Sequence, residues 1–287
     1  QVALTPVAAG GPDLASAVAA LTGGELHTQG RGWLVRWPGA VLVGFAQPEA
    51  PSWAPRATTS DVGEWIAASV GGAQRVVLDL TGVTAHDGGT GLLATAGAAL
   101  AGRELVGLVA ADELDLPATG IGGGLARRAF AGRVDVAELL AADAALAARA
   151  GSLGAGLATA GGGGAAGGSG LVVLAGGGTL STGTQFCRQL ADLAGTLARA
   201  DLVVTGCTEL SALDRGGPVV QAVAEWAAEA ERPCILFTTG AGMARRELRT
   251  IGLEAAHLLP PGPPTADGLT ATAARIAAGW VPGVGRP

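Results

Sequence analysis

The chain has 287 residues, of which 49% are hydrophobic and 15% are charged, and its formal net charge is −6. This length is enough for one large or two ordinary domains with a substantial core. The negative charge argues against a nucleic-acid partner, which requires a basic face, and no apolar run approaches the ~18–20 residues that a membrane span needs.

Two features of the composition limit the chemistry. All 18 basic residues are arginine, so the phosphates of any nucleotide must be met by arginine, by backbone N–H groups or by a metal ion. The three cysteines, Cys187, Cys207 and Cys234, are odd in number and lack the spacing of metal ligands. We therefore expect buried free thiols in a reducing cytoplasm, and no metal site built by the protein itself.

The first part of the chain predicts a mixture of strands and helices. Residues 2–7 predict a short strand that ends in a Gly10-Gly11 loop, and Asp13 is a plausible N-cap for a helix to about Leu21. Two further elements are expected: a β-hairpin of residues 33–37 and 40–45, and a helix that is capped by residues 59–61 and runs to Ser69.

The most informative stretch lies at residues 75–90. Val76, Val77, Leu78 and Leu80 form an apolar run that is typical of a strand covered on both faces, as in a parallel sheet. A glycine-rich loop follows, and a helical pattern opens near Thr90. Such a loop collects free backbone N–H groups and the positive end of the helix dipole, so the sequence predicts an anion site here.

The rest of the chain continues the alternation. The expected elements are strands at 105–110, 201–205 and 234–238 and helices at 121–130, 135–150, 185–200, 219–230, 243–251 and 265–278. This pattern predicts an α/β protein with mainly parallel sheets. The glycine run at 161–164 has two interpretations, a linker or a packed loop–helix element in which glycines allow close backbone approach. The apolar run at 171–174 favours the packed element.

Four segments resemble, in the same order, motifs of the bacterial glycerate kinases, which phosphorylate glycerate from ATP. V-A-A-G-G at residues 7–11 is similar to the family's M-A-D-G-G, and T-G-V-T-A-H-D-G-G at 81–89 is similar to G-G-S-A-T-N-D-G-G. G-G-A-A-G-G-S-G at 163–170 resembles G-A-G-A-A-G-G-L-G, and D-L-V-V-T-G at 201–206 resembles D-L-V-I-T-G. Together these segments span nearly the whole chain.

The resemblance implies a glycerate-kinase-like fold of two α/β domains with mainly parallel sheets, one of them Rossmann- or flavodoxin-like. It assigns residues 1–12 plus 190–287 to the Rossmann-like domain and residues 13–189 to an inserted α/β domain. The family's first strand, which carries D-S-F-K-G-S, has no counterpart in this sequence. The implied activity is ATP-dependent phosphoryl transfer to glycerate, with ATP and Mg²⁺ as cofactors if the protein is active.

Phosphoryl transfer requires positive charge at the phosphates, a carboxylate for the nucleophile or Mg²⁺, and glycine loops that admit the nucleotide. By the resemblance, Asp87 and Asp214 are the candidate catalytic residues, although Asp87 serves equally well as a helix N-cap. His86 is interpreted either as a polar loop residue or as a base. The candidate substrate- or nucleotide-binding residues lie in or beside the glycine loops: Gly10, Gly11, Thr84, His86, Gly88, Gly89, Asp112, Gly167, Gly168, Gly206 and Gly217.

Several charges of the family's motifs are changed. The family's catalytic G-E-G-R-x-D-x-Q-T-x-x-G-K-x-P corresponds to residues 206–218. Its acid, arginine, aspartate and lysine are replaced, in that order, by Cys207, Glu209, Ser211 and Pro218. A glutamate beside a polyphosphate reverses an ionic contact worth about 4 kcal/mol at an effective dielectric constant of ~20.

Two hypotheses follow. The chain is either a kinase of glycerate or a related small hydroxy acid, with catalysis impaired by the lost charges, or a non-catalytic relative that keeps the fold and binds a ligand or a protein partner. The expected partners are thus a glycerate-like small molecule or a protein, and a homodimer is left open.

Overall fold

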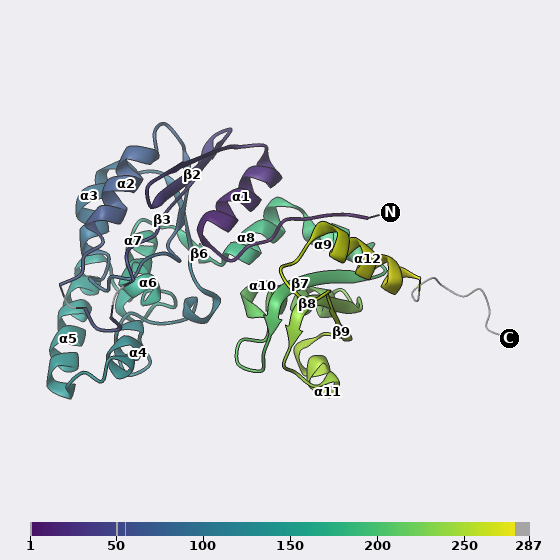
Figure 1. Cartoon of the computed structure of the whole chain (residues 1–287). Helices are drawn as coiled ribbons and strands as arrows, with labels where there is room; N and C mark the ends of the chain where they lie inside the picture. The colour runs from purple at the N-terminus through teal and green to yellow at the C-terminus, as the bar shows by residue number, and fades with distance from the viewer. Residues whose placement is uncertain (1, 50, 55, 279–287) are drawn as a thin grey trace. The chain divides into compact units, whose positions relative to one another are not determined.

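The computed structural model describes residues 2–49, 51–54 and 56–278. The chain divides into two compact units, residues 2–191 and residues from 192 onward, which we call the N-terminal and C-terminal units. Both units combine helices with sheets that are mainly parallel, so the expected α/β class is confirmed (Figure 1).

A six-stranded sheet forms the centre of the N-terminal unit, in the order β1-β2-β3-β4-β5-β6. The first three strands are antiparallel, and β3 to β6 are parallel. In the register, Gly44 of β3 pairs with Asp79 of β4, and Asp79 pairs with Leu108 of β5, so the carboxyl ends of the parallel strands are level. The strands are β1 (Glu25–Gln29), β2 (Gly32–Trp37), β3 (Ala40–Phe45), β4 (Arg75–Asp79), β5 (Glu104–Leu108) and β6 (Thr179–Ser181).

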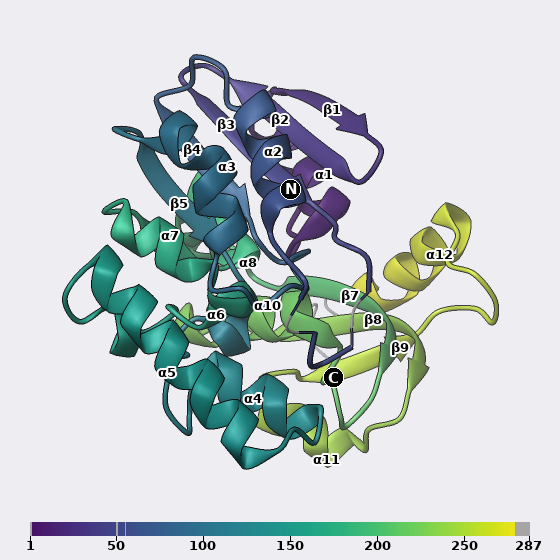
Figure 2. The ribbon, with the colours of Figure 1, turned by 90° about the vertical axis from the view of Figure 1, so that its left-hand side faces the viewer.

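Helices cover both faces of this sheet. Side chains alternate along a strand, so Val76 and Leu78 pack with α2, α3 and α7 while Val77 packs with α1 and α8. In Figure 2, α2 and α3 lie side by side over one face. The helices are α1 (Gly11–Thr22), α2 (Ser60–Ser69), α3 (Thr90–Leu100), α7 (Gly170–Ala175) and α8 (Gly183–Leu190).

A helical segment follows β5 and contains the glycine-rich region. It comprises η1 (Ala111–Glu113), α4 (Gly124–Ala131), α5 (Val136–Leu153), η2 (Leu157–Thr159) and α6 (Ala165–Gly168). Asp135 caps α5 by accepting a hydrogen bond from the backbone of Ala137 at 2.8 Å. Residues 162–164 of the glycine run and all residues of α6 are buried, which confirms the packed loop–helix interpretation over the linker.

The C-terminal unit contains a three-stranded parallel sheet in the order β7-β8-β9. Its core is formed by Val220, Ala224 and Ala227 of α10, Ile235 and Leu236 of β8, and Leu253, all at most 1% exposed. The elements are α9 (Leu193–Ala198), β7 (Val203–Leu210), α10 (Gly217–Glu229), β8 (Cys234–Ala241), α11 (Arg245–Leu248), η3 (Arg249–Ile251), β9 (Ala255–Leu258) and α12 (Ala266–Ala277).

The structure corrects several expected elements. Residues 2–7 form no strand, because no other described strand pairs with them. The single helix expected at 185–200 is wrong: α8 ends at Leu190, and Asp192 adopts a left-handed conformation with φ of 45° before α9 begins. α1 begins at Gly11, so Asp13 lies in its first turn and is not the N-cap. Within the described residues, no helix combines the length and the apolar character needed to cross a membrane.

Candidate functional site

The Gly10-Gly11 loop is attached to the carboxyl end of β4 by Asp79. Asp79 is 1% exposed; its carboxylate accepts hydrogen bonds from the backbone of Gly11 at 2.7 Å and from the Thr81 hydroxyl at 2.6 Å. Burial raises the pKa of Asp79, and the hydrogen bonds from Thr81 and Gly11 oppose that rise. A Cβ atom at Gly10 would lie 2.1 Å from the Thr81 hydroxyl oxygen, so only glycine fits there.

Asp87 joins the beginnings of α2 and α3. Its carboxylate accepts hydrogen bonds from the backbone N–H groups of Thr59, Gly89 and Gly91 at 2.9–3.0 Å. The hydroxyl of Thr59 lies 3.0 Å from both carboxylate oxygens, and that of Thr58 lies 3.2 Å from one of them. These contacts use the acceptor capacity of the carboxylate. The N-cap position of α3 is Gly89, so Asp87 is not the N-cap itself; it accepts from N–H groups at the start of α3 and also fastens the preceding loop.

Gln47, after β3, holds the loop that contains Thr84. The side-chain oxygen of Gln47 accepts hydrogen bonds from the backbone of Thr84 at 3.1 Å and of Ala85 at 2.9 Å. The Thr84 hydroxyl donates to the carbonyl of Pro48 at 2.9 Å. The N–H and hydroxyl groups of Thr84 are thus occupied by the loop after β3.

His86 lies two residues after Thr84 in the same loop. Its Nε2 accepts a hydrogen bond from the backbone of Ala54 at 3.3 Å, and its ring centroid lies 5.0 Å from that of Trp53. Burial lowers the pKa of His86, and so does the positive charge of Arg128, which donates to the Thr84 carbonyl at 2.7 Å. The imidazole is therefore neutral near pH 7, and one of its nitrogens is already used as an acceptor.

Gly88 and Gly89 contact Gly167 and Gly168 backbone to backbone. The Gly88 N–H donates to the Gly167 carbonyl at 3.1 Å. A Cβ atom at Gly167 would lie 1.9 Å from the Ala85 carbonyl oxygen, and one at Gly168 would lie 2.7 Å from the Gly88 Cα. The structure thus brings these four predicted residues together, and close packing of two loops accounts for the glycines.

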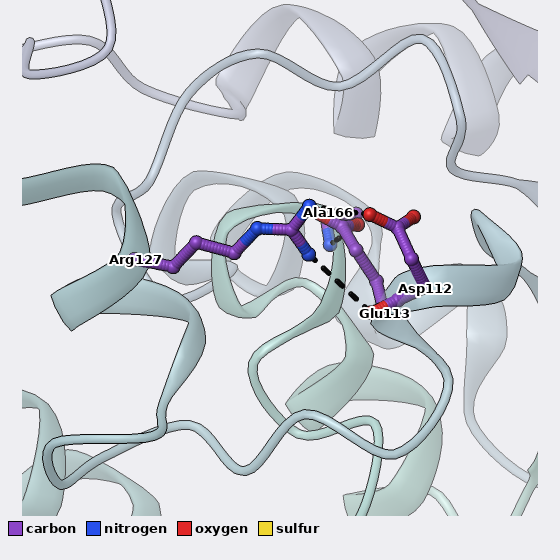
Figure 3. Close-up of polar contacts among 4 residues, drawn as sticks. All are labelled: Asp112, Glu113, Arg127 and Ala166. Atoms are coloured by element: carbon purple, nitrogen blue, oxygen red, sulfur yellow. Dashed lines mark hydrogen bonds and ion pairs between the residues drawn. The ribbon is translucent and has the colours of Figure 1, made fainter. Parts of the chain in front are cut away.

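Asp112 follows β5 and lies beside Arg127 of α4. The Arg127 guanidinium forms an ion pair with the Asp112 carboxylate and donates to the Asp112 backbone carbonyl at 3.3 Å. The neighbouring Glu113 reaches the glycine-rich segment, where its carboxylate accepts a hydrogen bond from the backbone of Ala166 at 2.9 Å. Figure 3 shows Arg127, the two acids and Ala166 together. Asp112 is therefore paired with an arginine at the carboxyl edge of the sheet.

The remaining predicted residues, Gly206, Asp214 and Gly217, belong to the C-terminal unit. Asp214 lies between β7 and α10, accepts hydrogen bonds from Ser211 at 2.8 Å and Gly216 at 3.1 Å, and is exposed. The Ser211 hydrogen bond and then that from Gly216 lower the pKa of Asp214, so its carboxylate is ionised. Gly216 and Gly217 have φ of 81° and 83°, which favours glycine at both positions.

A surface groove of about 260 Å³ begins beside this loop. It lies between α10 and the turn after η3 in the C-terminal unit. Its lining combines an arginine, an amide and a carboxylate with apolar side chains: Arg215, Gln221, Ala224, Glu225, Ala228, Ile251 and Gly252. Glu209, which the motif resemblance aligns with the family's arginine, is exposed near the end of β7.

Three residues that hold the loops at the carboxyl edge of the N-terminal sheet were not predicted from the sequence, namely Gln47, Asp79 and Glu113. A signal for Asp79 was present, because a carboxylate inside an apolar strand run must be hydrogen-bonded when it is buried. Nothing in the sequence marks Gln47 or Glu113, since their partners lie 37 and 53 residues away.

Comparison with known proteins identifies relatives of this chain. The model of the glycerate kinase family matches residues 130–280, more than half of the chain. Uncharacterized proteins of Mycobacterium bovis and Mycobacterium tuberculosis are each 34% identical over 219 residues, which is 73% of this chain and 57% of each relative. The chain therefore spans little more than half the length of these relatives.

The fold is also similar to a crystal structure. A Salmonella typhimurium LT2 protein assigned as glycerate kinase 2 superimposes with a TM-score of 0.71 at 20% identity, over 95% of this chain and 88% of that one. The likeness shows a common fold, and the match to the family model begins at the end of α4 and includes α5 and the elements from α6 to α12. The chain belongs to the glycerate kinase family.

Proposed function

We propose that the protein binds a small hydroxy acid of the glycerate class at the carboxyl edge of its N-terminal sheet, and that its ATP-dependent phosphoryl transfer is impaired. The observation that supports binding is the gathering of the Gly10-Gly11, 79–89 and 164–169 loops at the ends of the parallel strands. In open α/β sheets, ligands bind at this edge. Family membership supports the glycerate class of ligand.

Impairment is supported by the hydrogen bonds that Asp87 already makes and by the replacement of the family's basic residues. Asp87 uses its carboxylate oxygens in hydrogen bonds that fix two helix starts. Glu209 places a negative charge where the family has an arginine, and the chain has no lysine. Phosphoryl transfer requires positive charge at the transferred group, and a glutamate in place of an arginine opposes it.

ATP and Mg²⁺ belong to this proposal as the phosphoryl donor and its cation. Mg²⁺ is usually held by one or two carboxylates together with substrate phosphates. Asp214, which is exposed and ionised in a glycine-rich loop before α10, fits that use. Glu209, exposed near the end of the preceding strand, does not fit close contact with the phosphates.

Two measurements test the proposal. Glycerate should raise the melting temperature, because a ligand bound only by the folded state stabilises it by about 2.7 kcal/mol at one hundred times its Kd. Glycerate-dependent ADP release with Mg²⁺-ATP should be absent from the wild type and should appear or rise in Glu209→Arg. No stabilisation by glycerate would refute binding, and clear turnover by the wild type would refute impairment.

A non-catalytic role in binding a protein partner is the second candidate. It is favoured by exposed apolar side chains on the neighbouring helices α4 and α5, where Phe130, Val136 and Leu140 are 59%, 65% and 63% exposed. The same thermal measurement separates the two: stabilisation by neither ATP nor glycerate would support the partner-binding role.

A further inference from the structure

The loop that contains Ala166 is held in a conformation that residues with side chains rarely adopt. Ala166, Gly167 and Gly168 have successive φ values of 50°, 65° and 89°. For an alanine this left-handed conformation costs roughly 1–2 kcal/mol, and Ala166 is only 3% exposed. The following N–H groups of Gly168 and Ser169 donate to the carbonyls of Gly164 and Ala166, at 3.3 and 3.2 Å, so the loop leaves the Ala166 N–H for an acceptor outside it. The surrounding packing therefore presents the Ala166 N–H as a single donor, a potential site for one anionic oxygen.

A carboxylate of the protein already occupies this site. The N–H of Ala166 donates to Glu113 at 2.9 Å, although the two residues are 53 positions apart. Glu113 is half-buried on η1, immediately after β5, so a rotation of its side chain can release it to solvent. An anion that replaced Glu113 would find the same backbone donor.

A cation lies beside the same position. Arg127 pairs with Asp112, and both Asp112 and Glu113 raise the pKa of Arg127. Figure 3 shows the guanidinium and the two acids next to Ala166. When Glu113 turns away, Arg127 retains only Asp112 as a neighbouring acid among these residues. A new anion would restore the second negative charge.

Ser169 adds a second unusual feature to the same loop. Its side chain is completely buried, and its hydroxyl has no hydrogen-bond partner within the described structure. Buried hydroxyl groups are normally satisfied by protein or water. An unpaired serine hydroxyl three residues after Ala166 indicates that the loop has polar capacity beyond the contact with Glu113.

We propose that the Ala166 backbone and Arg127 form a binding site for a small oxyanion, and that the Glu113 carboxylate occupies this site when no ligand is bound. The oxyanion is either the carboxylate of the hydroxy acid or a phosphate group; the first identification rests on the proposed function. Glu113 then acts as an internal competitor, which an anionic ligand displaces without a change in the fold.

The test compares anion binding by the full chain and by Glu113→Ala. Calorimetric titration with inorganic phosphate and, separately, with glycerate at constant ionic strength should show at least about tenfold tighter binding by the variant. The matched control is Asp115→Ala, which removes the same charge two residues away from an exposed side chain. Addition of Arg127→Gln to Glu113→Ala should remove the gain. The anion that binds more tightly shows whether the site is built for the carboxylate of the hydroxy acid or for a phosphate group.

Equal affinities in the wild type and Glu113→Ala would overturn the proposal, and so would an equal gain in Asp115→Ala. If Glu113→Ala does not fold, Glu113→Gln keeps the side chain and removes its charge, and a smaller gain is expected. In the wild type, the amide resonance of Ala166 should shift and saturate with the binding anion; binding without that shift would also overturn the proposal. Phosphate binding without glycerate binding would support this site while the proposed glycerate-binding function fails.

Discussion

Replacement of Asp87 by alanine should destabilise the N-terminal unit more than the loss of an ordinary helix cap. The change leaves the N–H groups of Thr59, Gly89 and Gly91 without their acceptor. An unsatisfied buried donor costs about 1–3 kcal/mol, and these donors are only partly buried, so we expect a loss of about 3–4 kcal/mol. Asp87→Asn keeps one acceptor oxygen and should lose about half of that.

The control is Asp135→Ala, which removes the exposed cap of α5 and one hydrogen bond to Ala137. That loss should be about 1 kcal/mol. Urea unfolding followed by tryptophan fluorescence gives the free energies, and hydrogen exchange should show faster exchange at Gly91 and Leu92 in Asp87→Ala alone. If Asp87→Ala costs no more than Asp135→Ala, the capping role is wrong, and Asp87 is free to serve as a ligand group.

Three further predictions concern packing and titration. Gly167→Ala should lower the free energy of unfolding by about 3 kcal/mol or prevent folding, because the new Cβ would lie 1.9 Å from a carbonyl oxygen. The control is Gly177→Ala, at a position with φ of 74° and open space around it. Its free energy of unfolding, measured in urea, should fall by only about 1–2 kcal/mol. The lowered pKa of His86 means that the unfolded chain takes up the proton first, so stability is lost as the pH falls below about 6.5. The dependence of the unfolding free energy on pH in this range should be weaker in His86→Gln. An unchanged pH dependence would contradict the lowered pKa of His86. Burial raises the pKa of Cys234 to about 12, so a maleimide at pH 8 should label it only after unfolding, and rapid labelling of the native protein would show that the thiol is accessible.

Elements with strong local signals could be predicted from the sequence. The apolar run around Asp79 predicted β4. The helices expected at 135–150 and 265–278 are α5 and α12, and the structure shows Asp135 and Thr265 as their caps. The pattern could not show the break at Asp192, because a left-handed aspartate leaves the amphipathic spacing of its neighbours unchanged. β1 was missed because it is exposed along its whole length and lacks apolar alternation.

The site was predictable in position but not in its internal connections. The Gly88-Gly89 loop follows a strand as expected and packs on Gly167, because small residues are needed where two backbones touch. The prediction was wrong for Gly206, which lies inside β7, and for the strand expected before Gly10. The partner of a polar side chain is not encoded locally. Asp79 accepts from Gly11 across 68 residues, and Asp87 reaches back 28 residues to Thr59. Only the folded arrangement shows that these acids hold loops together.

The number of hydrogen bonds that each acid makes decides where a ligand can bind in the N-terminal unit. At Asp79 and Asp87, a ligand would have to break several hydrogen bonds that fix loops and helix starts, which costs stability each time. At Ala166, the group to be displaced is one half-buried glutamate side chain on a short helical turn, and its release leaves the backbone contacts of Gly88 with Gly167 unchanged. Anion binding is therefore expected at Ala166 in preference to either aspartate. Protection of the Ala166 amide from hydrogen exchange in the presence of phosphate, without change at Gly11 or Gly91, is the corresponding observation.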